Sequence, residues 1–238
     1  MSLHIDIRKK LPHYDLDIEM DCSGKSLTIV IGPSGSGKST LMRIISGLEK
    51  PDNGVIAFGN EIWFDSDRRF HLPPQKRRIG YVFQDYALFP HLTVEENISF
   101  ASKDKQMVRN LLALFGLSHL KNRKPQTISG GESQRCAICQ ALAREPQVLL
   151  LDEPFSALDV FTRRDLREEL KGLREDFPMP IIYVTHDVNE AFYLADTIIP
   201  VVDGRVDKDW LQRSLSRVDP SGGTRAKSVR EPKLQLAY

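Results

Sequence analysis

The sequence is poor in cysteine, has no long apolar run and carries almost no net charge. Its 238 residues include three cysteines, and the formal net charge at pH 7 is +1. So few cysteines exclude the multi-bridge framework of small secreted domains. A net charge near zero argues against a broad nucleic-acid-binding surface. No apolar run approaches the roughly 20 residues that a membrane-spanning helix needs, so we expect the chain itself not to span a bilayer.

The N-terminus and the cysteines give two further expectations. MSLHIDIRKK contains no apolar signal region, so we expect the chain to remain in the cytosol, where cysteines stay reduced. Cys136 and Cys139 form a C-x-x-C pair, a spacing found in redox and metal sites. No second pair and no nearby histidine pair completes a set of four ligands. We therefore expect both cysteines to be small buried residues on one face of a helix.

Apolar runs predict the strands of the fold. LHIDIRKKL and YDLDIEMD alternate apolar and polar residues, which is typical of two antiparallel strands joined by a turn at Pro12 and His13. SLTIVIG, VLLLDEP and IIYVTHD are continuous apolar runs, typical of strands covered on both faces. VIAFGNEIW predicts a short strand or hairpin, and TIIPVVDGRV predicts a closing hairpin that turns at Asp203 and Gly204. There is no internal repeat.

Helical patterns separate these strands and predict the domain organisation. From about residue 90 to residue 144 the apolar spacing is mostly helical, as in QMVRNLLALFGL. Strands that alternate with helices predict an α/β fold with a mostly parallel core sheet. Besides this core, the sequence predicts an N-terminal antiparallel β-subdomain and a helical subdomain inserted at about residues 88–145. The predicted domain covers residues 1–213, and residues 214–238 form a polar tail expected to be flexible.

The segment GPSGSGKST matches the phosphate-binding pattern G-x-x-x-x-G-K-[ST] in full. It follows the strand SLTIVIG and precedes the helical segment TLMRIISGL, which is the context that the pattern requires. Glycines allow backbone N–H groups to turn inward around an anion at the positive end of a helix. We expect Lys38 to reach the β- and γ-phosphates of a nucleotide and Ser39 to ligate Mg²⁺. The predicted loop consists of Gly32, Pro33, Ser34, Gly35, Ser36, Gly37, Lys38, Ser39 and Thr40.

Two carboxylates follow the buried strand VLLLDEP. Asp152 ends the apolar run, and a carboxylate there needs a partner, for which the Mg²⁺ beside Ser39 is suited. Glu153 comes next, and alternation along a strand predicts that the two side chains diverge. We therefore expect Asp152 to serve the metal and Glu153 to polarise an attacking water as the general base. The alternative is that Glu153 caps the turn before Pro154.

Two further polar residues follow apolar strands. His186 ends IIYVTHD, and ligands of open α/β sheets lie beyond the carboxyl ends of the strands. We expect His186 to contact the γ-phosphate as a donor, although a histidine at a strand end is by itself more often structural. Gln84 follows IGYVF, and a neutral amide there can ligate Mg²⁺ or orient water. The core with the phosphate loop is thus predicted to be that of a P-loop NTPase.

The segment TISGGESQRC predicts a second anion site without a lysine. Ser129, Gly130 and Gly131 precede good helix formers, so a helix begins here with a serine cap. Its N-terminal amides and the Ser129 hydroxyl can bind an anion. The phosphate loop already surrounds its own nucleotide on one side. If two identical chains pair head to tail, each SGG segment caps the nucleotide of the other, which closes a two-fold dimer.

These motifs, in this order, resemble the ATP-binding subunit of the ABC transporter family over about residues 3–210. GPSGSGKST matches the Walker A motif, VLLLDEP matches Walker B and ISGGE matches the signature. Gln84 matches the Q-loop, Asp159 in SALD the D-loop and His186 in THD the switch histidine. The resemblance implies ATP and Mg²⁺ as ligands, ATP hydrolysis, and a homodimer in which the signature, including Glu132, meets the ATP of the opposite subunit. In that dimer Asp159 helps to join the two sites.

Two features depart from the family pattern. The usual signature is LSGGQ, and here Ile128 and Glu132 replace its outer residues. The isoleucine is a conservative replacement, whereas Glu132 puts a negative charge near a ribose or phosphate, where it can weaken or tune ATP binding. The family also uses an N-terminal aromatic residue to stack on adenine. Tyr14 and His13 are the candidates for this role.

Within the family, PPQKRRIGYVFQDYALFPHLTVEENI is similar to the importer branch for oxyanions, iron, polyamines and sugars. The start KLPHYDLDIEM is most similar to molybdate and tungstate importers. The resemblance implies a subunit that powers uptake of an oxyanion or of another of these solutes. It also implies a permease that contacts Gln84 to Pro90, where Tyr86, Leu88 and Phe89 are large apolar residues in a loop.

The resemblance also implies where the chain acts in the cell, and two other classes of protein are the alternatives to it. We expect the chain to be peripheral to the cytoplasmic face of the inner membrane, with an extracytoplasmic binding protein as an indirect partner and no nucleic acid. One alternative is a soluble ABC-type ATPase acting on DNA or ribosomes, but the coiled coils, zinc modules or second ATPase domain usual there are not visible. Another is a P-loop GTPase or small-molecule kinase, but no N-K-x-D motif is present. Neither alternative explains the SGG segment.

Overall fold

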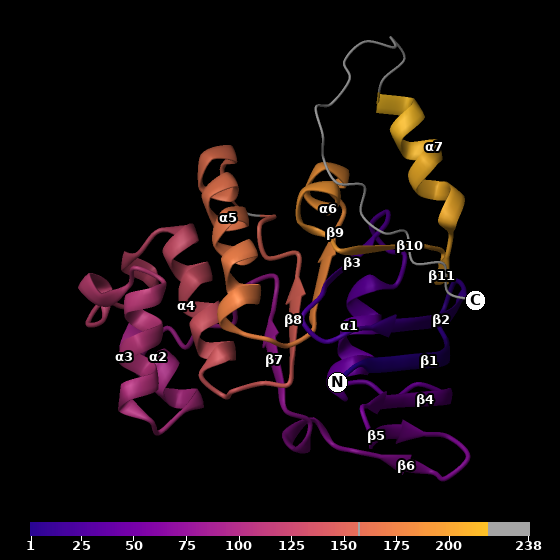
Figure 1. Ribbon diagram of the computed structural model, residues 1–238, viewed down its shortest axis with the longest axis horizontal. Helices are drawn as coiled ribbons and strands as arrows, with labels where there is room; N and C mark the ends of the chain where they lie inside the picture. The colour runs from indigo at the N-terminus through magenta and orange to yellow at the C-terminus, as the bar shows by residue number, and fades with distance from the viewer. Residues whose placement is uncertain (157, 219–238) are drawn as a thin grey trace. The chain divides into compact units, whose positions relative to one another are not determined.

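The computed structural model describes residues 1–156 and 158–218, and the chain divides into two compact units (Figure 1). The first unit combines Met1–Arg77 with Ile182–Tyr238, and the second unit is Arg78–Ile181. Segments far apart in the sequence therefore build the first unit together. No helix among the described residues is both long enough and apolar enough to cross a membrane.

An antiparallel layer forms the N-terminal part of the first unit. Its strands are β1 (Leu3–Lys10), β2 (Asp15–Cys22), β4 (Asn53–Phe58), β5 (Glu61–Asp65) and β6 (Phe70–His71). Strand β1 pairs with β2 on one side and with β4 on the other, both antiparallel (Figure 1). Buried and exposed residues alternate along β1 and β2, so one face of this layer is buried. The two predicted N-terminal strands and their connecting turn are confirmed.

The other part of the first unit contains buried strands and the helices that follow them. The strands are β3 (Leu27–Ile31), β9 (Ile181–Thr185), β10 (Thr197–Val202) and β11 (Arg205–Val206), and the helices are α1 (Lys38–Ser46), α6 (Val188–Leu194) and α7 (Lys208–Val218). Every residue of β3 and β9 is buried, which explains their uninterrupted apolar sequences. β10 lies parallel to β3 and antiparallel to β11. The strand order within this unit is β6-β5-β4-β1-β2-β11-β10-β3-β9.

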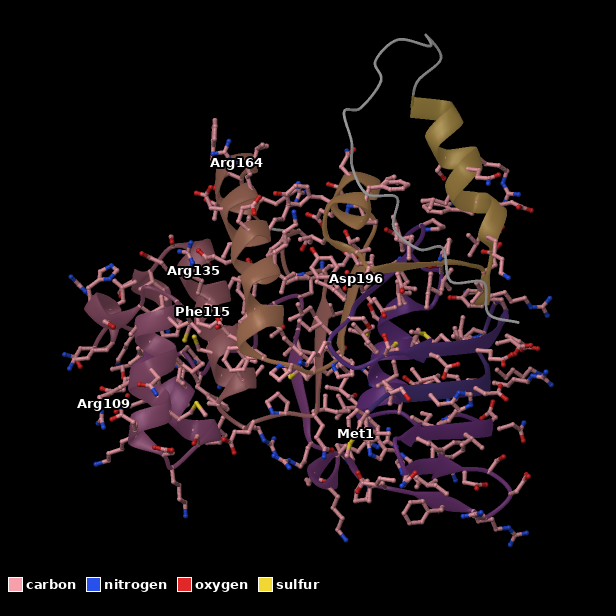
Figure 2. The ribbon with its side chains drawn as sticks, viewed as in Figure 1. Met1, Arg109, Phe115, Arg135, Arg164 and Asp196 are labelled. Carbon is pink, nitrogen blue, oxygen red and sulfur yellow. The ribbon has the colours of Figure 1, made fainter. Side chains whose placement is uncertain are left out.

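Two side chains fix the ends of the β3–α1 segment. The carboxylate of Asp196, labelled in Figure 2, accepts a 2.8 Å hydrogen bond from the Leu27 amide at the start of β3. At the far end, the buried Arg77 guanidinium donates to the carbonyls of Ile44 and Ile45 in the last turn of α1, at 2.9 and 2.6 Å. A cation at the C-terminal end of a helix also interacts favourably with its dipole. The loop between β3 and α1 is thus carried by a segment anchored at both ends.

The second unit combines two parallel strands with a group of helices. The strands are β7 (Ile79–Val82) and β8 (Val148–Asp152), the α-helices are α2 (Val94–Ala101), α3 (Lys105–Leu114), α4 (Gly130–Leu142) and α5 (Val160–Asp176), and single 3₁₀ turns lie at Ser118–Leu120 and Pro125–Thr127. β7 pairs with β8 in parallel, from Ile79 opposite Val148 to Val82 opposite Leu151. α2, α3 and α4 cluster together (Figure 1). Another 3₁₀ turn, Pro74–Lys76, belongs to the first unit and lies just before Arg77, the last residue of that unit's first segment.

The structure confirms the α/β fold, and the predicted domain boundaries stay predictions. The predicted helical subdomain, residues 88–145, lies inside the second unit, Arg78–Ile181. This unit extends beyond the subdomain and also includes β7, β8 and α5. The predicted polar tail, residues 214–238, overlaps the end of α7, which continues to Val218. Trp210 and Leu211 give α7 an apolar side, and Leu211 is buried, so the helix extends past the point where polar residues begin to dominate the sequence. Residues 219–238 lie outside the described part of the chain.

The C-x-x-C pair lies inside α4 and is buried, as expected. Cys136 Sγ donates to the Val94 carbonyl at 3.9 Å, and Cys139 Sγ donates to the Leu111 carbonyl at 3.7 Å. Burial raises the pKa of Cys136 to about 12, so its thiol stays protonated at neutral pH. Inert thiols of this kind serve packing between α4 and its neighbours.

Candidate functional site

The phosphate loop lies between the buried end of β3 and the first residue of α1. Gly35 and Gly37 have φ angles of +82° and +99°, a backbone conformation that favours glycine. Gly37 is the N-cap of α1 and supplies no side-chain hydrogen bond to the helix. A Cβ atom added to Gly35 would have no heavy atom within 4 Å, apart from its own chain neighbours. The loop therefore presents an uncapped helix end beside open space.

Lys38 is folded onto this loop. Its side chain is 5% exposed, and Nζ donates to the carbonyls of Gly32 and Pro33 at 2.9 and 2.7 Å. Ser36 Oγ lies 3.4 Å away. A buried ammonium group needs such partners, and phosphate oxygens are stronger ones than carbonyls. The ammonium group of Lys38 is thus held by carbonyls of the phosphate loop in which the sequence places it.

Tyr14 lies against the same loop. Its hydroxyl donates to the carbonyl oxygen of Gly35, and a Cβ atom added to Gly37 would lie 3.3 Å from that hydroxyl. His13, the other candidate for adenine stacking, is exposed. Stacking by either residue stays a prediction. Of these two candidates, only Tyr14 forms a hydrogen bond with the phosphate loop in the described part of the chain.

His186 follows β9 in the first unit, at a strand end held by a buried carboxylate. Glu190 of α6 is 3% exposed and accepts hydrogen bonds from the hydroxyls of Tyr183 and Thr185, both at 2.8 Å. Asp187 caps α6 by accepting from the Asn189 amide at 2.8 Å. His186 is exposed between these two anchors. The sequence shows no motif that would have revealed the role of Glu190.

Asp152 and Glu153 follow β8 in the second unit. Asp152 is 7% exposed, and Oδ2 accepts a 3.2 Å hydrogen bond from the Tyr81 hydroxyl. β8 ends at Asp152, and Glu153 has a φ angle of +45°. The alternation expected for a strand therefore does not extend to Glu153. A left-handed backbone turns the chain there instead, and such strain in a non-glycine residue is common at functional sites.

Gln84 is exposed in the loop after β7, and the residues that follow it are unusual. Tyr86 and Ala87 have φ angles of +63° and +50°. The Tyr86 hydroxyl is buried and has no hydrogen-bond partner among the described residues. Its burial raises the pKa of this phenol. A buried polar group without a hydrogen-bond partner costs free energy. The described residues of this unit provide no acceptor for the Tyr86 hydroxyl.

Asn97, buried in α2, holds the later part of this loop. Its Nδ2 donates to the carbonyls of Phe89 and Thr93 at 3.2 and 2.9 Å, and its Oδ1 accepts from the Phe89 amide at 2.8 Å. The Phe89 ring packs on Phe100, with centroids 4.5 Å apart, and Phe100 is 68% exposed. Sequence reasoning missed both Asn97 and Phe100. The only signal in the sequence is the helical pattern of the segment that contains both residues, and it does not show that either one contacts Phe89.

The signature segment begins α4 with a reciprocal cap. Ser129 Oγ accepts from the Glu132 amide at 3.3 Å, and Glu132 Oε2 accepts from the Ser129 amide at 2.7 Å. The bond from the Ser129 amide lowers the pKa of Glu132. A Cβ atom on Gly131 would lie 2.6 Å from Thr162 Cγ2 of α5, which explains a glycine there. Farther along α4, Arg135, labelled in Figure 2, forms a bidentate ion pair with Glu169 of α5.

Asp159 caps α5 with both carboxylate oxygens. Oδ1 accepts from the amides of Phe161 and Thr162 at 3.0 and 3.1 Å, and Oδ2 accepts from the Thr162 hydroxyl at 2.6 Å. These bonds, led by that of the Thr162 hydroxyl, lower the pKa of Asp159. Val160 and Phe161 follow it and are 77% and 78% exposed. The D-loop aspartate is therefore ordered within its own chain.

The predicted residues thus form two groups, one in each unit. The first unit holds the phosphate loop, Tyr14 and His186, and the second holds Gln84, Asp152, Glu153, the signature and Asp159. The buried parallel strands, the helices between them and the loop at residues 32–40 define an α/β fold of the P-loop NTPase class.

Comparison with known proteins identifies the family within this class. The ABC transporter family model matches residues 16–156. The chain is 43% identical over 204 residues to the molybdenum import ATP-binding protein ModC of Photobacterium profundum, covering 85% of this chain and 57% of the relative. It is 45% identical over 208 residues to the sulfate/thiosulfate import ATP-binding protein CysA of Nephroselmis olivacea, covering 84% and 58%. The chain belongs to the ABC transporter family, and it carries the family's ATP-binding domain.

Solved structures agree with this assignment. A dimeric post-hydrolysis state of the ATP-binding cassette MJ0796, bound to ADP and Pi, matches with a TM-score of 0.71 and 32% identity over 87% of this chain and 97% of that chain. CbiO1 of Clostridium perfringens, part of the transporter complex cbiONQ, matches with a TM-score of 0.76 and 27% identity over 92% and 95%. The chain spans a little more than half the length of the curated relatives that it matches.

Proposed function

We propose that this chain is the ATP-hydrolysing subunit of an ABC importer and that it powers the uptake of an oxyanion through a partner permease. The observation that carries the proposal is the phosphate loop, with its uncapped α1 end and stored Lys38. Relatives named for molybdenum and for sulfate or thiosulfate import support an oxyanion as the solute. Iron, polyamines and sugars remain the alternatives within the importer branch.

The residues present suit ATP and Mg²⁺. Lys38 and the loop amides would hold the β- and γ-phosphates, because both offer donors to anionic oxygens. Ser39, Asp152 and Gln84 would ligate Mg²⁺, which prefers hydroxyl, carboxylate and amide oxygens. The Tyr81 hydroxyl bonded to Asp152 is the kind of outer partner that orients a metal-binding carboxylate. Bound Mg²⁺ would neutralise negative charge on the phosphate oxygens.

Glu153 and His186 would complete the hydrolytic chemistry. Glu153 would accept a proton from the attacking water as the general base. Its left-handed backbone, with a φ angle of +45°, turns the chain directly after the end of β8 at Asp152. His186 would donate a hydrogen bond to the γ-phosphate, and the anchors at Glu190 and Asp187 keep the backbone around it fixed.

A second copy of the chain would complete each site. The signature residues Ser129, Gly130, Gly131 and Glu132 would approach the ATP held by the other copy, and Asp159 would help to join the two sites. The dimeric cassette structure among the neighbours supports this arrangement. The head-to-tail pairing of identical chains gives a closed two-fold dimer.

The permease would dock on the loop from Gln84 to Pro90. This loop offers half-buried apolar side chains, an exposed Phe100 beside Phe89, and the buried Tyr86 hydroxyl. A permease segment that supplies an acceptor for this hydroxyl would remove an energetic cost of the isolated subunit. Closure of the dimer would then move the docked permease. The subunit would lie on the cytoplasmic face of the inner membrane, with an extracytoplasmic binding protein as an indirect partner.

The proposal is tested by Mg²⁺-dependent ATP hydrolysis of the purified chain, with Lys38→Ala as the inactive control. Activity that is absent from the wild type, or retained in the control, contradicts it. The solute is tested separately by uptake of radiolabelled molybdate and sulfate in cells that carry the chain with its genomically neighbouring permease. Uptake of iron, a polyamine or a sugar instead would redirect the assignment within the importer branch.

A further inference from the structure

A phosphate loop has an outer side whose hydrogen bonds also need partners. Because its amides turn toward the anion, carbonyls of the loop turn the other way and require donors of their own. Two successive carbonyls here receive donors from outside the loop. The Tyr14 hydroxyl donates to the Gly35 carbonyl, and the Gly204 amide donates to the Ser36 carbonyl at 3.1 Å.

Both donors belong to one hydrogen-bonded assembly. The Asp17 amide of β2 donates to the Gly204 carbonyl at 2.7 Å, so the turn between β10 and β11 is tied to β2. The Tyr14 ring packs closely on this turn, because a Cβ atom added to Gly204 would lie 2.6 Å from Tyr14 Cδ2. The Tyr14 carbonyl accepts from the Leu11 amide at 3.0 Å, which closes the turn between β1 and β2. The Tyr14 side chain is therefore held on the loop from several directions.

The phenol also has the right protonation state for this bond. Burial, followed by the nearby Asp203 carboxylate, raises the pKa of Tyr14 above its ordinary value of 10.0. The hydroxyl consequently remains a donor at neutral pH. A phenylalanine at this position would keep the ring and its packing but leave the Gly35 carbonyl without this donor.

We infer that Tyr14 is a positioning residue for the phosphate loop, whose hydroxyl holds the Gly35 carbonyl outward and so arranges the loop amides for phosphate before nucleotide binds. The inference rests on the proposed nucleotide site and adds a role that differs from base stacking. Stacking acts on the adenine through the ring face. The bond to Gly35 acts on the phosphates through the hydroxyl, and it affects ligands that have no base.

Tyr14→Phe separates the two roles. Its affinity for Mg²⁺-ATP and for Mg²⁺-tripolyphosphate, measured by titration calorimetry, should fall by the same factor, roughly 3- to 10-fold for one lost hydrogen bond. In the nucleotide-free chain, hydrogen exchange of the peptide that covers residues 32–40 should become faster. Tyr193→Phe, which removes a hydroxyl on α6, is the matched control and should leave both measurements at wild-type values.

Three outcomes overturn the inference or separate it from the proposed function. Unchanged tripolyphosphate affinity and unchanged loop exchange in Tyr14→Phe contradict it. Weaker ATP binding in Tyr14→Ala alone, with normal tripolyphosphate binding in both variants, assigns base stacking in place of loop positioning. If the folded wild type binds neither ligand, the proposed function fails, and the exchange measurement on Tyr14→Phe still decides whether the hydroxyl holds the loop.

Discussion

The two helix ends that are expected to meet phosphate are built in opposite ways. The N-terminus of α1 has Gly37 as its N-cap and no side-chain cap, and the loop before it is held from its outer side. The N-terminus of α4 has a reciprocal cap in which Ser129 and Glu132 bond to each other's amides. The first end is therefore prepared for an external anion, whereas the second already contains a carboxylate of its own.

This difference suggests an order of events. An uncapped helix end with arranged amides can bind phosphate without first giving up an internal bond. A capped end must share or exchange its cap when a new anion arrives. We therefore expect nucleotide to bind first at the phosphate loop of one copy and the signature of the second copy to engage afterwards. The following predictions test this contrast.

The largest expected effect is on hydrolysis itself, which requires both helix ends. Glu153→Gln should lower the rate of ATP hydrolysis by about 10²- to 10⁴-fold, the usual contribution of a general base. ATP binding should remain, so ATP should convert this variant into a dimer on size exclusion. Turnover at the wild-type rate would show that Glu153 is not the base.

Mutations at the two helix ends should then have different effects when each is combined with Glu153→Gln. Adding Lys38→Ala should weaken ATP binding by the monomer roughly 100-fold, because two charge-assisted bonds to phosphate are lost. Adding Ser129→Arg should leave monomer binding within about 2-fold of its parent and prevent the ATP-dependent dimer. Calorimetry and size exclusion distinguish these results. Loss of monomer binding in the Ser129 variant would contradict the assignment of the signature to a second copy.

The other end of α1 gives a stability prediction. Arg77 is 1% exposed and also donates to the carbonyls of Leu72 and Trp63, at 2.9 and 3.1 Å. Burial lowers its pKa to about 10, which still leaves it charged at neutral pH. Arg77→Met should destabilise the chain by about 3 kcal/mol, because buried carbonyls lose their donor.

Arg78→Met is the matched control for this prediction. Arg78 is exposed and donates one hydrogen bond, to the Glu145 carbonyl at 2.9 Å, so the loss should be below about 0.5 kcal/mol. Urea unfolding monitored by circular dichroism measures both variants. Equal losses in the two would show that the contacts of Arg77 with α1 do not stabilise the fold.

Motifs with a fixed spacing could be predicted from the sequence, as could the strands. The phosphate loop after β3 was predictable, because a continuous apolar run, several glycines and a lysine all occur in one short segment. The Ser129 cap and the start of α4 were likewise visible as a serine before good helix formers. In these places the local sequence determines the local structure, so a motif alone predicts the element that contains it.

Long-range polar contacts could not be predicted in the same way. Arg77 stands in the basic run KRR and is indistinguishable there from its exposed neighbours until the end of α1 packs against it. Asn97 and Glu190 are ordinary polar residues within helical patterns, and their roles depend on backbone groups or hydroxyls of other segments. The left-handed backbone of Glu153 has no sequence signal either, because glutamate seldom adopts it.

The smallest expected effect concerns the charge at the capped helix end. Glu132→Gln keeps an oxygen that can accept from the Ser129 amide and removes only the negative charge. Charges at a helix N-terminus contribute about 0.3–1 kcal/mol, so ATP-driven dimer formation should strengthen by about 2- to 5-fold when the charge no longer opposes phosphate.

Acid pH should show the opposite effect of the same charge on helix stability. Because the folded-state pKa of Glu132 lies below its ordinary value of 4.5, the wild-type carboxylate stabilises the fold above that pH and loses this contribution as the pH falls through the lowered pKa. Glu132→Gln should lack this part of the acid dependence, which unfolding curves between neutral and acid pH measure. If the variant instead dimerises less readily with ATP, the carboxylate assists the bound nucleotide. The contrast between an open and a self-capped phosphate site would then have to be revised.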